Sequence, residues 1–232
     1  MQIFYTPDIN GVEYNFNEEE SRHAIKVLRM GINDEVGLID GKGTFYKAVI
    51  ASADPKKSKV LVKEVITNFE KRNYRLHIAI SPVKNPDRFE WFLEKATEIG
   101  IDKITPLRCE RSEKKTINTD RCNRIIESAM KQSIHAFHPV LQPLTRFIDF
   151  IESTQSRSKL IATCEGFRQP IRTVYTVGTD TVILVGPEGD FTEYEINQAK
   201  THNFVPISLG STRLRTETAG IVACHSICFL NS

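Results

Sequence analysis

The sequence has few of the features that mark secreted, membrane-bound or metal-dependent proteins. Its five cysteines are odd in number and none forms a CxxC pair, which favours reduced thiols over a disulfide framework. The six histidines do not fall at metal-ligand spacing with them, so no metal site is predicted. The start, MQIFYTPDINGVEY, lacks the regions of a signal peptide, and the apolar stretch 219–230 is too short to span a bilayer. We therefore expect a cytoplasmic protein without membrane contact.

An excess of charge of one sign is also missing. Lysine and arginine number 31, aspartate and glutamate 29, and the formal net charge is +2, so bulk charge alone is weak support for a nucleic-acid partner. Common nucleotide and hydrolase motifs are absent too: there is no GxxxxGK[ST], no GxGxxG and no GxSxG. These absences disfavour a Rossmann oxidoreductase and a hydrolase with a nucleophile elbow.

The first part of the chain has the sequence pattern of a small β domain. Short alternating runs such as EVGLIDG and KVLVKEVI predict strands, and GKG at 41–43 predicts a turn between two of them. One helix, EEESRHAIKVLRM, is expected to begin after an Asn17 cap and to end at Gly31. We predict a β-barrel-like domain over 1–70, followed by a polar linker, NFEKRN, at 68–73.

Strands and helices alternate in the remainder of the chain, 71–232. RLHIAI, DKITPL, SKLIATC, TVILVG and FVPISL predict strands, and the last of these precedes a terminal helix, TETAGIVACHSICFL. Between them, Pro86 and Gly100 delimit a helix with one apolar face, and Thr192 and Glu195 form a capping box for another. This alternation predicts an α/β domain with a largely parallel sheet.

Polar, glycine-rich stretches follow three of these strands. They are TCEGF at 163–167, VGPEGDFT at 185–192 and LGSTRLRTETAG at 209–220. Ligands of open α/β sheets bind beyond the carboxyl ends of the strands, and glycines let backbone approach a ligand closely. For 185–192 alone, a plain strand-to-helix turn explains the pattern equally well.

The stretch LGSTRLRTETAG contains charges that helix capping does not explain. Thr216 is a candidate N-cap, and Glu217 complements the helix dipole in the first turn. Arg213 and Arg215, by contrast, are cations beside the positive end of a helix, which costs energy unless an anion balances them. Glu188, Glu217, a ligand carboxylate or an RNA phosphate are the possible partners, and we favour a functional interpretation.

Two motifs together carry a resemblance to a known family. VGPEGDFT, followed by LGSTRLRTETA, closely resembles the signatures of the 16S ribosomal RNA (uracil-N3)-methyltransferases, which belong to the SPOUT superfamily of knotted, S-adenosylmethionine-dependent enzymes. HAIKVLRMGINDEVGLIDGKG resembles the N-terminal domain of that family, and EKATEIGIDKITPL and AMKQS match its middle region. The resemblance therefore covers nearly the whole chain.

The resemblance implies a fold and a cofactor. It implies a deep trefoil knot in the C-terminal α/β domain, which periodicity does not predict, and a PUA-like, RNA-binding β-barrel over 1–70. Knot loops would wrap S-adenosylmethionine in a bent form. The cofactor-binding positions carried over are Thr163, Glu165, Leu184, Gly186, Pro187, Glu188, Gly189, Leu209, Gly210, Leu214, Thr216, Thr218 and Ala219.

Two residues are the catalytic candidates. Methylation at uracil N3 requires removal of the N3 proton, or a cation that stabilises the resulting imidate. We predict that Arg215 stabilises this charge or orients the RNA. Glu217 either orients Arg215 or accepts the proton, and its helix-dipole role is an equally good alternative.

The resemblance also implies partners. The substrate would be 16S RNA, expected within the small ribosomal subunit, and the enzyme would be a homodimer in which the apolar helix 217–230 forms either the interface or plain core. Alternatives are a SPOUT methyltransferase acting on another RNA, such as transfer RNA, or a catalytically silent RNA-binding protein of ribosome assembly. The residues predicted to contact RNA are Arg22, Arg29, Arg108, Arg111, Gln132 and His135.

The chain departs from the family pattern at a few positions. Asp190 stands where the family usually has glycine, and aspartate tolerates the left-handed backbone of such a turn. Thr212 replaces a frequent arginine, and Arg213 occupies a usually aliphatic position. Ile134 and His135 replace the glycine and arginine that often follow QS. The departures concern RNA contacts more than the cofactor site.

Overall fold

The computed structural model describes all residues from Met1 to Ser232, and the chain divides into two compact units. Unit 1 comprises Met1–Lys71 together with Met130–His138, and unit 2 comprises Arg72–Ala129 and Pro139–Ser232. The sequence predicted a single boundary near residue 70, which placed residues 130–138 in the second domain. These residues join unit 1 because Met130 and Ala136 are buried beside Ile3 and Ile39.

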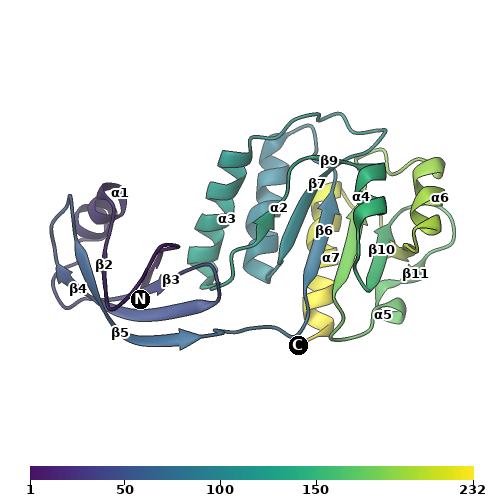
Figure 1. Ribbon diagram of the computed structural model, residues 1–232. Helices are drawn as coiled ribbons and strands as arrows, with labels where there is room; N and C mark the ends of the chain where they lie inside the picture. The colour runs from purple at the N-terminus through teal and green to yellow at the C-terminus, as the bar shows by residue number, and fades with distance from the viewer. The chain divides into compact units, whose positions relative to one another are not determined.

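Unit 1 is built on a mixed sheet of five strands in the order β1-β3-β4-β5-β2 (Figure 1). β1 pairs parallel with β3, and the other pairs are antiparallel. Alternate side chains such as Val36, Leu38 and Ile50 point to one face and form the core with Phe4 and Phe16. The strands are β1 (Gln2–Tyr5), β2 (Glu13–Asn15), β3 (Glu35–Ile39), β4 (Thr44–Ser52) and β5 (Lys59–Thr67).

The single helical segment of the first seventy residues begins as predicted and ends earlier than predicted. The Asn17 side chain caps α1 (Glu18–Arg22) by accepting a hydrogen bond from the Glu20 N–H at 2.8 Å. A π-helical turn, His23–Val27, continues it. The helix stops where Arg29 takes a left-handed conformation, with φ +57°, so the prediction that Gly31 ends it was wrong.

The GKG turn joins β3 to β4, as predicted, and its second glycine has a steric reason. Gly43 has a φ of +103° and donates its N–H to the Ala136 carbonyl at 2.8 Å. A Cβ at this position would lie 2.3 Å from the Phe137 ring. Only glycine allows the turn to pack this closely against the segment 130–138.

Unit 2 contains an entirely parallel sheet of eight strands, in the order β11-β13-β10-β12-β6-β7-β8, with β9 also paired to β7. This confirms the predicted α/β domain. The strands are β6 (Leu76–Ile80), β7 (Lys103–Arg108), β8 (Val140–Leu141), β9 (Thr145–Arg146), β10 (Ser158–Ala162), β11 (Gln169–Pro170), β12 (Thr181–Val185) and β13 (Val205–Ser208). The helices are α2 (Pro86–Ile99), α3 (Thr119–Ser133, whose residues from Met130 on belong to unit 1), α4 (Phe147–Ser153), α5 (Ile171–Val174), α6 (Glu193–Thr201) and α7 (Thr216–Leu230).

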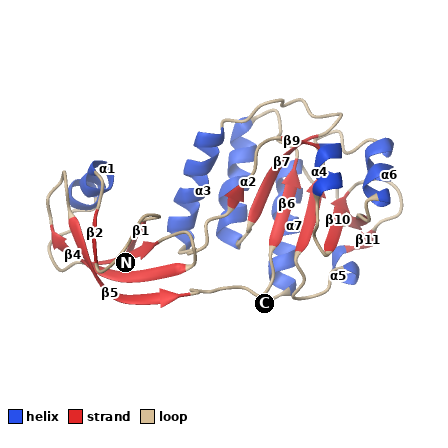
Figure 2. Ribbon diagram, viewed as in Figure 1, coloured by secondary structure: helices blue, strands red, loops and turns tan.

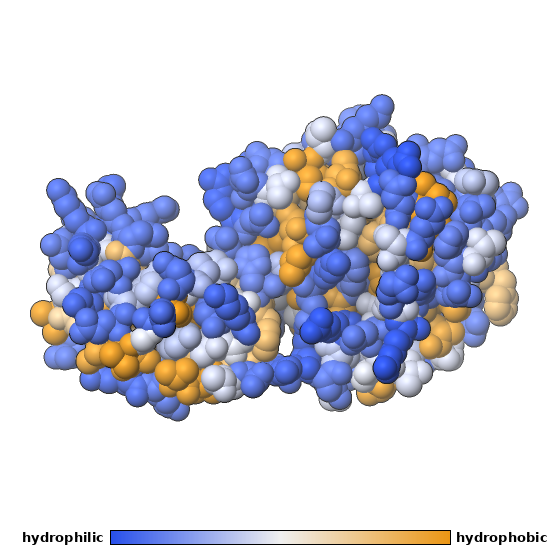
Figure 3. Space-filling model, in the orientation of Figure 1, coloured by the Kyte–Doolittle hydropathy of each residue, from blue (hydrophilic) through white to orange (hydrophobic).

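Helices cover both faces of this sheet (Figures 1 and 2). Ile78 and Ile80 of β6 face a core shared with α2, α3 and α7, whereas Ala79 faces a core shared with α4 and α6. α2 and α7 approach closely at Gly220, where a Cβ would lie 2.6 Å from the Phe92 ring. No helix of the chain is both long and apolar enough to cross a membrane. The face drawn in Figure 3 is mostly hydrophilic, with small apolar patches.

Candidate active site

Three loops of unit 2 meet at the end of the sheet where the carboxyl ends of its strands lie. They follow β10, β12 and β13, which are neighbours in the sheet, and all three strands run parallel. A cavity of about 300 Å³ lies among the loops. It is lined by Ala162, Cys164, Val185, Gly186, Pro187, Glu188, Asp190, Arg213, Leu214, Arg215, Thr216 and Ala219. Most of these residues come from the stretches in which the sequence predicted a ligand site.

Other predicted cofactor positions do not line this cavity. Leu209 and Gly210 line a separate cavity of about 580 Å³ beside α5 and the end of α7. Leu184 is fully buried in β12, and its side chain packs in the core on the α6 face. Thr163 lies at the edge of the site, where its hydroxyl accepts the N–H of Glu165 at 3.2 Å.

Asp190 ties two of the loops together. Its φ is +61°, so aspartate adopts the left-handed conformation that the sequence led us to expect. One carboxylate oxygen accepts hydrogen bonds from the Thr163 hydroxyl at 3.0 Å and from the Cys164 N–H at 2.7 Å. The other accepts the Phe191 N–H at 2.8 Å. The carboxylate therefore fixes the loop after β10 against the loop after β12.

The start of α7 differs from the prediction. Arg215 is the N-cap residue, without a side-chain cap, and Thr216 is the first residue of the helix. The prediction that Thr216 caps the helix was wrong because its hydroxyl is used elsewhere: it donates to the Gly186 carbonyl at 3.0 Å. This buried hydrogen bond attaches the start of α7 to the loop after β12, and both residues line the cavity.

The two arginines of the last loop have different surroundings. Arg213 donates to the Glu188 backbone carbonyl at 3.3 Å, not to the Glu188 carboxylate. Arg215 is exposed, and its side chain has no hydrogen bond or ion pair with any other residue. It borders the 300 Å³ cavity and also a neighbouring one of about 350 Å³. Its charge is thus available to a ligand in either cavity.

Glu217 is a buried carboxylate in the neighbouring cavity. The residue is only 7% exposed. One carboxylate oxygen lies 3.8 Å from the Arg88 guanidinium, and the other is buried with no hydrogen-bond partner. Such an orphan acceptor is costly, and this oxygen is closed off from solvent. Arg88 and Trp91 line the same cavity.

Sequence reasoning missed Arg88 and Trp91. The only available signal was their spacing: they lie three residues apart on α2, which puts them on one helix face. The apolar residues used to predict α2, Phe89 and Phe92, belong to the buried side. Only the structure shows that the exposed ring of Trp91 lines one cavity together with Arg88 and with Arg215 at the start of α7.

The loops after β6 and β7 support the site from the other side. Arg111, predicted to contact RNA, donates to the Gly189 carbonyl at 2.6 Å. The hydroxyls of Ser81 and Ser112 lie 2.8 Å apart. Arg108 ends β7. The other predicted RNA contacts, Arg22, Arg29, Gln132 and His135, belong to unit 1.

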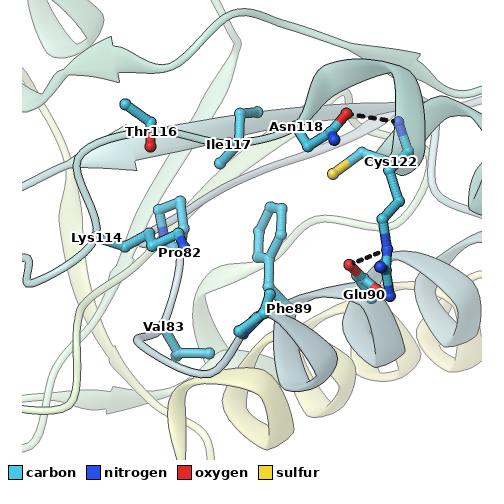
Figure 4. Close-up of a pocket in the computed structure, with 11 residues that line it drawn as sticks. Pro82, Val83, Phe89, Glu90, Lys114, Thr116, Ile117, Asn118 and Cys122 are labelled. Atoms are coloured by element: carbon cyan, nitrogen blue, oxygen red, sulfur yellow. Dashed lines mark hydrogen bonds and ion pairs between the residues drawn. The ribbon is translucent and has the colours of Figure 1, made fainter.

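A fourth cavity, of about 520 Å³, lies beside these two loops (Figure 4). The Phe89 ring points from α2 into it, between Pro82 and Cys122 and toward Ile117. Val83, Pro86, Glu90, Lys114, Thr116, Asn118 and Arg121 complete the lining.

Comparison with known proteins finds relatives along nearly the whole chain. A family model described as an RNA methyltransferase domain matches residues 70–228, and one described as an RNA methyltransferase PUA domain matches residues 16–63. A Buchnera aphidicola protein named "Ribosomal RNA small subunit methyltransferase E" is 29% identical over 97% of this chain and 92% of its own length. A Synechocystis protein with the same name is 30% identical, over 87% of this chain and 68% of its own.

Solved structures agree with this chain in both fold and sequence. A probable rRNA-methyltransferase from Porphyromonas gingivalis is 40% identical, with a TM-score of 0.93 over 100% of this chain and 98% of that chain. A ribosomal RNA small subunit methyltransferase E from Neisseria gonorrhoeae, bound to S-adenosyl methionine, is 27% identical, with a TM-score of 0.88 over 100% of this chain and 98% of that chain.

Proposed function

This chain is a member of the RNA methyltransferase family, and on that premise we propose that it transfers a methyl group from S-adenosylmethionine to N3 of one uridine in 16S ribosomal RNA. The names of its relatives support a small-subunit RNA substrate, and the cofactor-bound Neisseria relative supports the methyl donor. One observation carries the choice of chemistry. Arg215, which has no intramolecular partner, lines the same cavity as Glu217, a buried carboxylate with one unpaired oxygen.

The residues of the 300 Å³ cavity fit S-adenosylmethionine. Ala162, Leu214 and Ala219 supply apolar surface, and the carboxylates of Glu188 and Asp190 complement the positive charges of the cofactor. Arg213 lies at the same wall and complements its carboxylate. When bound, the cofactor supplies an electrophilic methyl group. We propose that the loops which hold it form the trefoil knot of the SPOUT enzymes.

We propose separate tasks for the residues around the 350 Å³ cavity. The Glu217 carboxylate accepts the N3 proton of uracil, so that the N3–H bond breaks as the proton moves to the carboxylate. The guanidinium groups of Arg88 and Arg215 stabilise the negative charge that develops on the uracil oxygens. Trp91 offers an exposed ring to the base. N3 would then form its bond to the methyl carbon as the bond from that carbon to the sulfur of the donor breaks.

The remaining assignments concern partners. We propose that unit 1 acts as a PUA-like, barrel-shaped RNA-binding domain, which the match of residues 16–63 supports. We also propose a homodimer that forms through α7, where the large side chain of Phe229 is 67% exposed. The RNA is proposed to be bound within the small ribosomal subunit.

A methyl-transfer assay tests the function. Small subunits that lack the modification are incubated with the protein and cofactor, and the digested RNA is analysed by mass spectrometry. We expect 3-methyluridine at one position of 16S RNA. Turnover should fall at least about 100-fold in Arg215→Ala and remain unchanged in Arg157→Ala, an exposed arginine before β10 at the opposite edge of the sheet.

Two other outcomes would contradict the proposal in different ways. Cofactor binding without methylation of small-subunit RNA would favour an enzyme that acts on another RNA. Absence of both cofactor binding and methylation would favour a silent RNA-binding protein of ribosome assembly. Unchanged turnover in Arg215→Ala would remove this arginine from the mechanism.

A further inference from the structure

The 520 Å³ cavity of Figure 4 lies next to the cofactor loops without being part of them. It sits at the carboxyl ends of β6 and β7, and β6 is the sheet neighbour of β12. The Ser81 N–H donates to the Val185 carbonyl at 3.0 Å, and the Lys84 N–H lies 3.4 Å from the Glu188 carboxylate. These bonds fix the wall of the cavity to the loop that lines the cofactor site.

The lining has an apolar floor and a polar rim. Pro82, Val83, Phe89 and Cys122 are buried and form the floor, whereas Thr116, Asn118 and Arg121 are exposed at the rim. A flat apolar group with polar edges matches this distribution, because its faces contact the floor and its edges reach the rim. An unpaired nucleobase has this shape and chemistry, and proteins hold such bases between apolar and aromatic side chains.

The charge at the rim is complementary to a nucleotide phosphate. Lys114, which lines the cavity, has no acidic partner. The one carboxylate of the lining, Glu90, is neutralised by Arg121 through contacts of 2.7 Å. A negatively charged ligand therefore meets an excess of positive charge at the mouth of the cavity.

The position relative to α2 suggests which base occupies it. Pro86, Phe89 and Glu90 line this cavity, whereas Asp87, Arg88 and Trp91 of the same helical turns line the cavity of Glu217 and Arg215. The first turns of α2 thus separate the two cavities. An RNA strand that crosses this helix end can place two nearby bases on its two sides.

We propose that this cavity binds one unpaired base of the RNA substrate, close in sequence to the methylated uridine, and that Lys114 contacts its phosphate. The identity of the RNA rests on the proposed function; the binding of an extruded base does not. Insertion of a second base would hold the strand open while the target base leaves its partner, which base-modifying enzymes require.

Binding measurements on small subunits that lack the modification test the proposal. Thr116→Trp fills the cavity from an exposed position, and Lys114→Ala removes the phosphate contact. The matched controls are Thr176→Trp, at an exposed threonine before β12, and Lys115→Ala, outside the lining. We expect Thr116→Trp to weaken RNA binding about tenfold, the size of one stacked base, and Lys114→Ala to weaken it several-fold. Both controls should stay within about twofold, with cofactor affinity unchanged throughout.

A second measurement identifies the base. A 16S RNA fragment around the target uridine is made with single abasic sites at each flanking position. One abasic site should weaken binding to the natural protein but not to Thr116→Trp, because the variant has already lost that contact. Equal sensitivity of both proteins to every abasic site would overturn the proposal, as would natural RNA affinity in Thr116→Trp. If Lys114→Ala and Lys115→Ala lose equal RNA affinity, the lysines act only through general charge, and this result would also overturn the proposal.

Failure of the proposed function gives a different pattern. If small-subunit RNA is not methylated but is bound, the comparison of Thr116→Trp with Thr176→Trp still reports on the cavity. If the natural protein does not distinguish small subunits from unrelated RNA, the function fails, and a tenfold loss of general RNA binding in Thr116→Trp alone still supports the base pocket. Lower affinity for cofactor in Thr116→Trp would show a disturbed fold. In that case the RNA affinity of Lys114→Ala, compared with that of Lys115→Ala, decides whether the cavity binds RNA.

Discussion

Asp190 shows how one side chain can both permit and stabilise a loop. Its backbone is left-handed, and its carboxylate accepts three hydrogen bonds. Glycine tolerates the same backbone but lacks the carboxylate. Asp190→Gly should therefore lower the free energy of unfolding by about 1–3 kcal/mol, the effect of losing hydrogen bonds to a charged group. Urea denaturation measures this.

Asp190→Ala separates the two contributions. Alanine loses the same hydrogen bonds and also resists the left-handed conformation, which costs roughly 1 kcal/mol more. We expect the stability order Asp190, then glycine, then alanine. If alanine proves at least as stable as glycine, the left-handed backbone is not a constraint at this position.

Glu217 should act through its charge and not through its shape. Glu217→Gln keeps the size of the side chain but removes a group that can take a proton. We expect kcat to fall about 10²-fold or more, the usual contribution of a general base, with little change in cofactor affinity. Single-turnover methylation measures the chemical step, and the control is Glu193→Gln, an exposed residue in the first turn of α6. A normal single-turnover rate in Glu217→Gln would show that Glu217 is not the general base. Its role would then be limited to its contact with Arg88.

His77 makes the stability of unit 2 sensitive to acid. Burial, followed by the nearby charge of Lys103, lowers its pKa from 6.5 to about 3. Its ring nitrogen lies 2.8 Å from the Thr105 hydroxyl. Below pH 6.5 the unfolded chain binds a proton at this histidine that the folded chain refuses, so stability is full above pH 6.5 and falls toward pH 3. The slope from this residue is about 1.4 kcal/mol per pH unit.

Replacement of this histidine tests the effect. His77→Gln should flatten the dependence of unfolding free energy on pH between 6.5 and 3, measured by denaturant titration at each pH. His225→Gln, at an exposed histidine of α7, should not. An unchanged pH dependence in His77→Gln would mean that another group accounts for acid sensitivity.

At the scale of elements, the contact of α2 with α7 depends on one glycine. A Cβ at Gly220 would meet the Phe92 ring at 2.6 Å and the Ile80 side chain at 2.8 Å. Alanine favours the helix by about 1 kcal/mol over glycine, but overpacking a core costs about 1–3 kcal/mol. Gly220→Ala should therefore lower stability overall, as thermal unfolding would detect. Gly31→Ala, where a Cβ meets nothing within 4 Å, should not, and equal effects would contradict the packing argument.

Helix starts could be predicted from the sequence because they depend on neighbouring residues. Asn85 caps α2 through the Asp87 N–H at 3.0 Å, and Thr192 with Glu195 forms the predicted capping box. The prediction for Thr216 failed because a contact distant in sequence decides there. Thr216 donates its hydroxyl to Gly186, thirty residues away, and no local pattern reports this.

At the scale of the whole molecule, the sheet order was beyond local reasoning. β13 pairs with β10, and β12 pairs with β6, although other elements separate them in the chain. This order brings to one cavity the three polar loops that the sequence had marked separately as candidate ligand-binding stretches. Likewise, the segment 130–138 joins unit 1 through Gly43 and Phe137, a contact that periodicity cannot indicate.

Some lysine and arginine side chains are less available to RNA because they form ion pairs within the protein. Arg72 forms an ion pair with Asp102 at 2.7 Å, and Lys59 one with Glu13 at 3.0 Å. Lys56 and Lys57 stay exposed without acidic partners. RNA affinity should therefore depend on a few dispersed cations, since the net charge is only +2.

Salt dependence measures how many of these cations touch phosphate. With about four contacts, the affinity for RNA should fall about 50-fold between 50 and 200 mM salt. The paired variant Lys56→Ala with Lys57→Ala should lower the slope of log affinity against log salt by about 1.4. Cofactor affinity, measured in parallel, should change little because its site is enclosed by loops. A slope identical to that of the natural protein would place both lysines outside the RNA-binding surface.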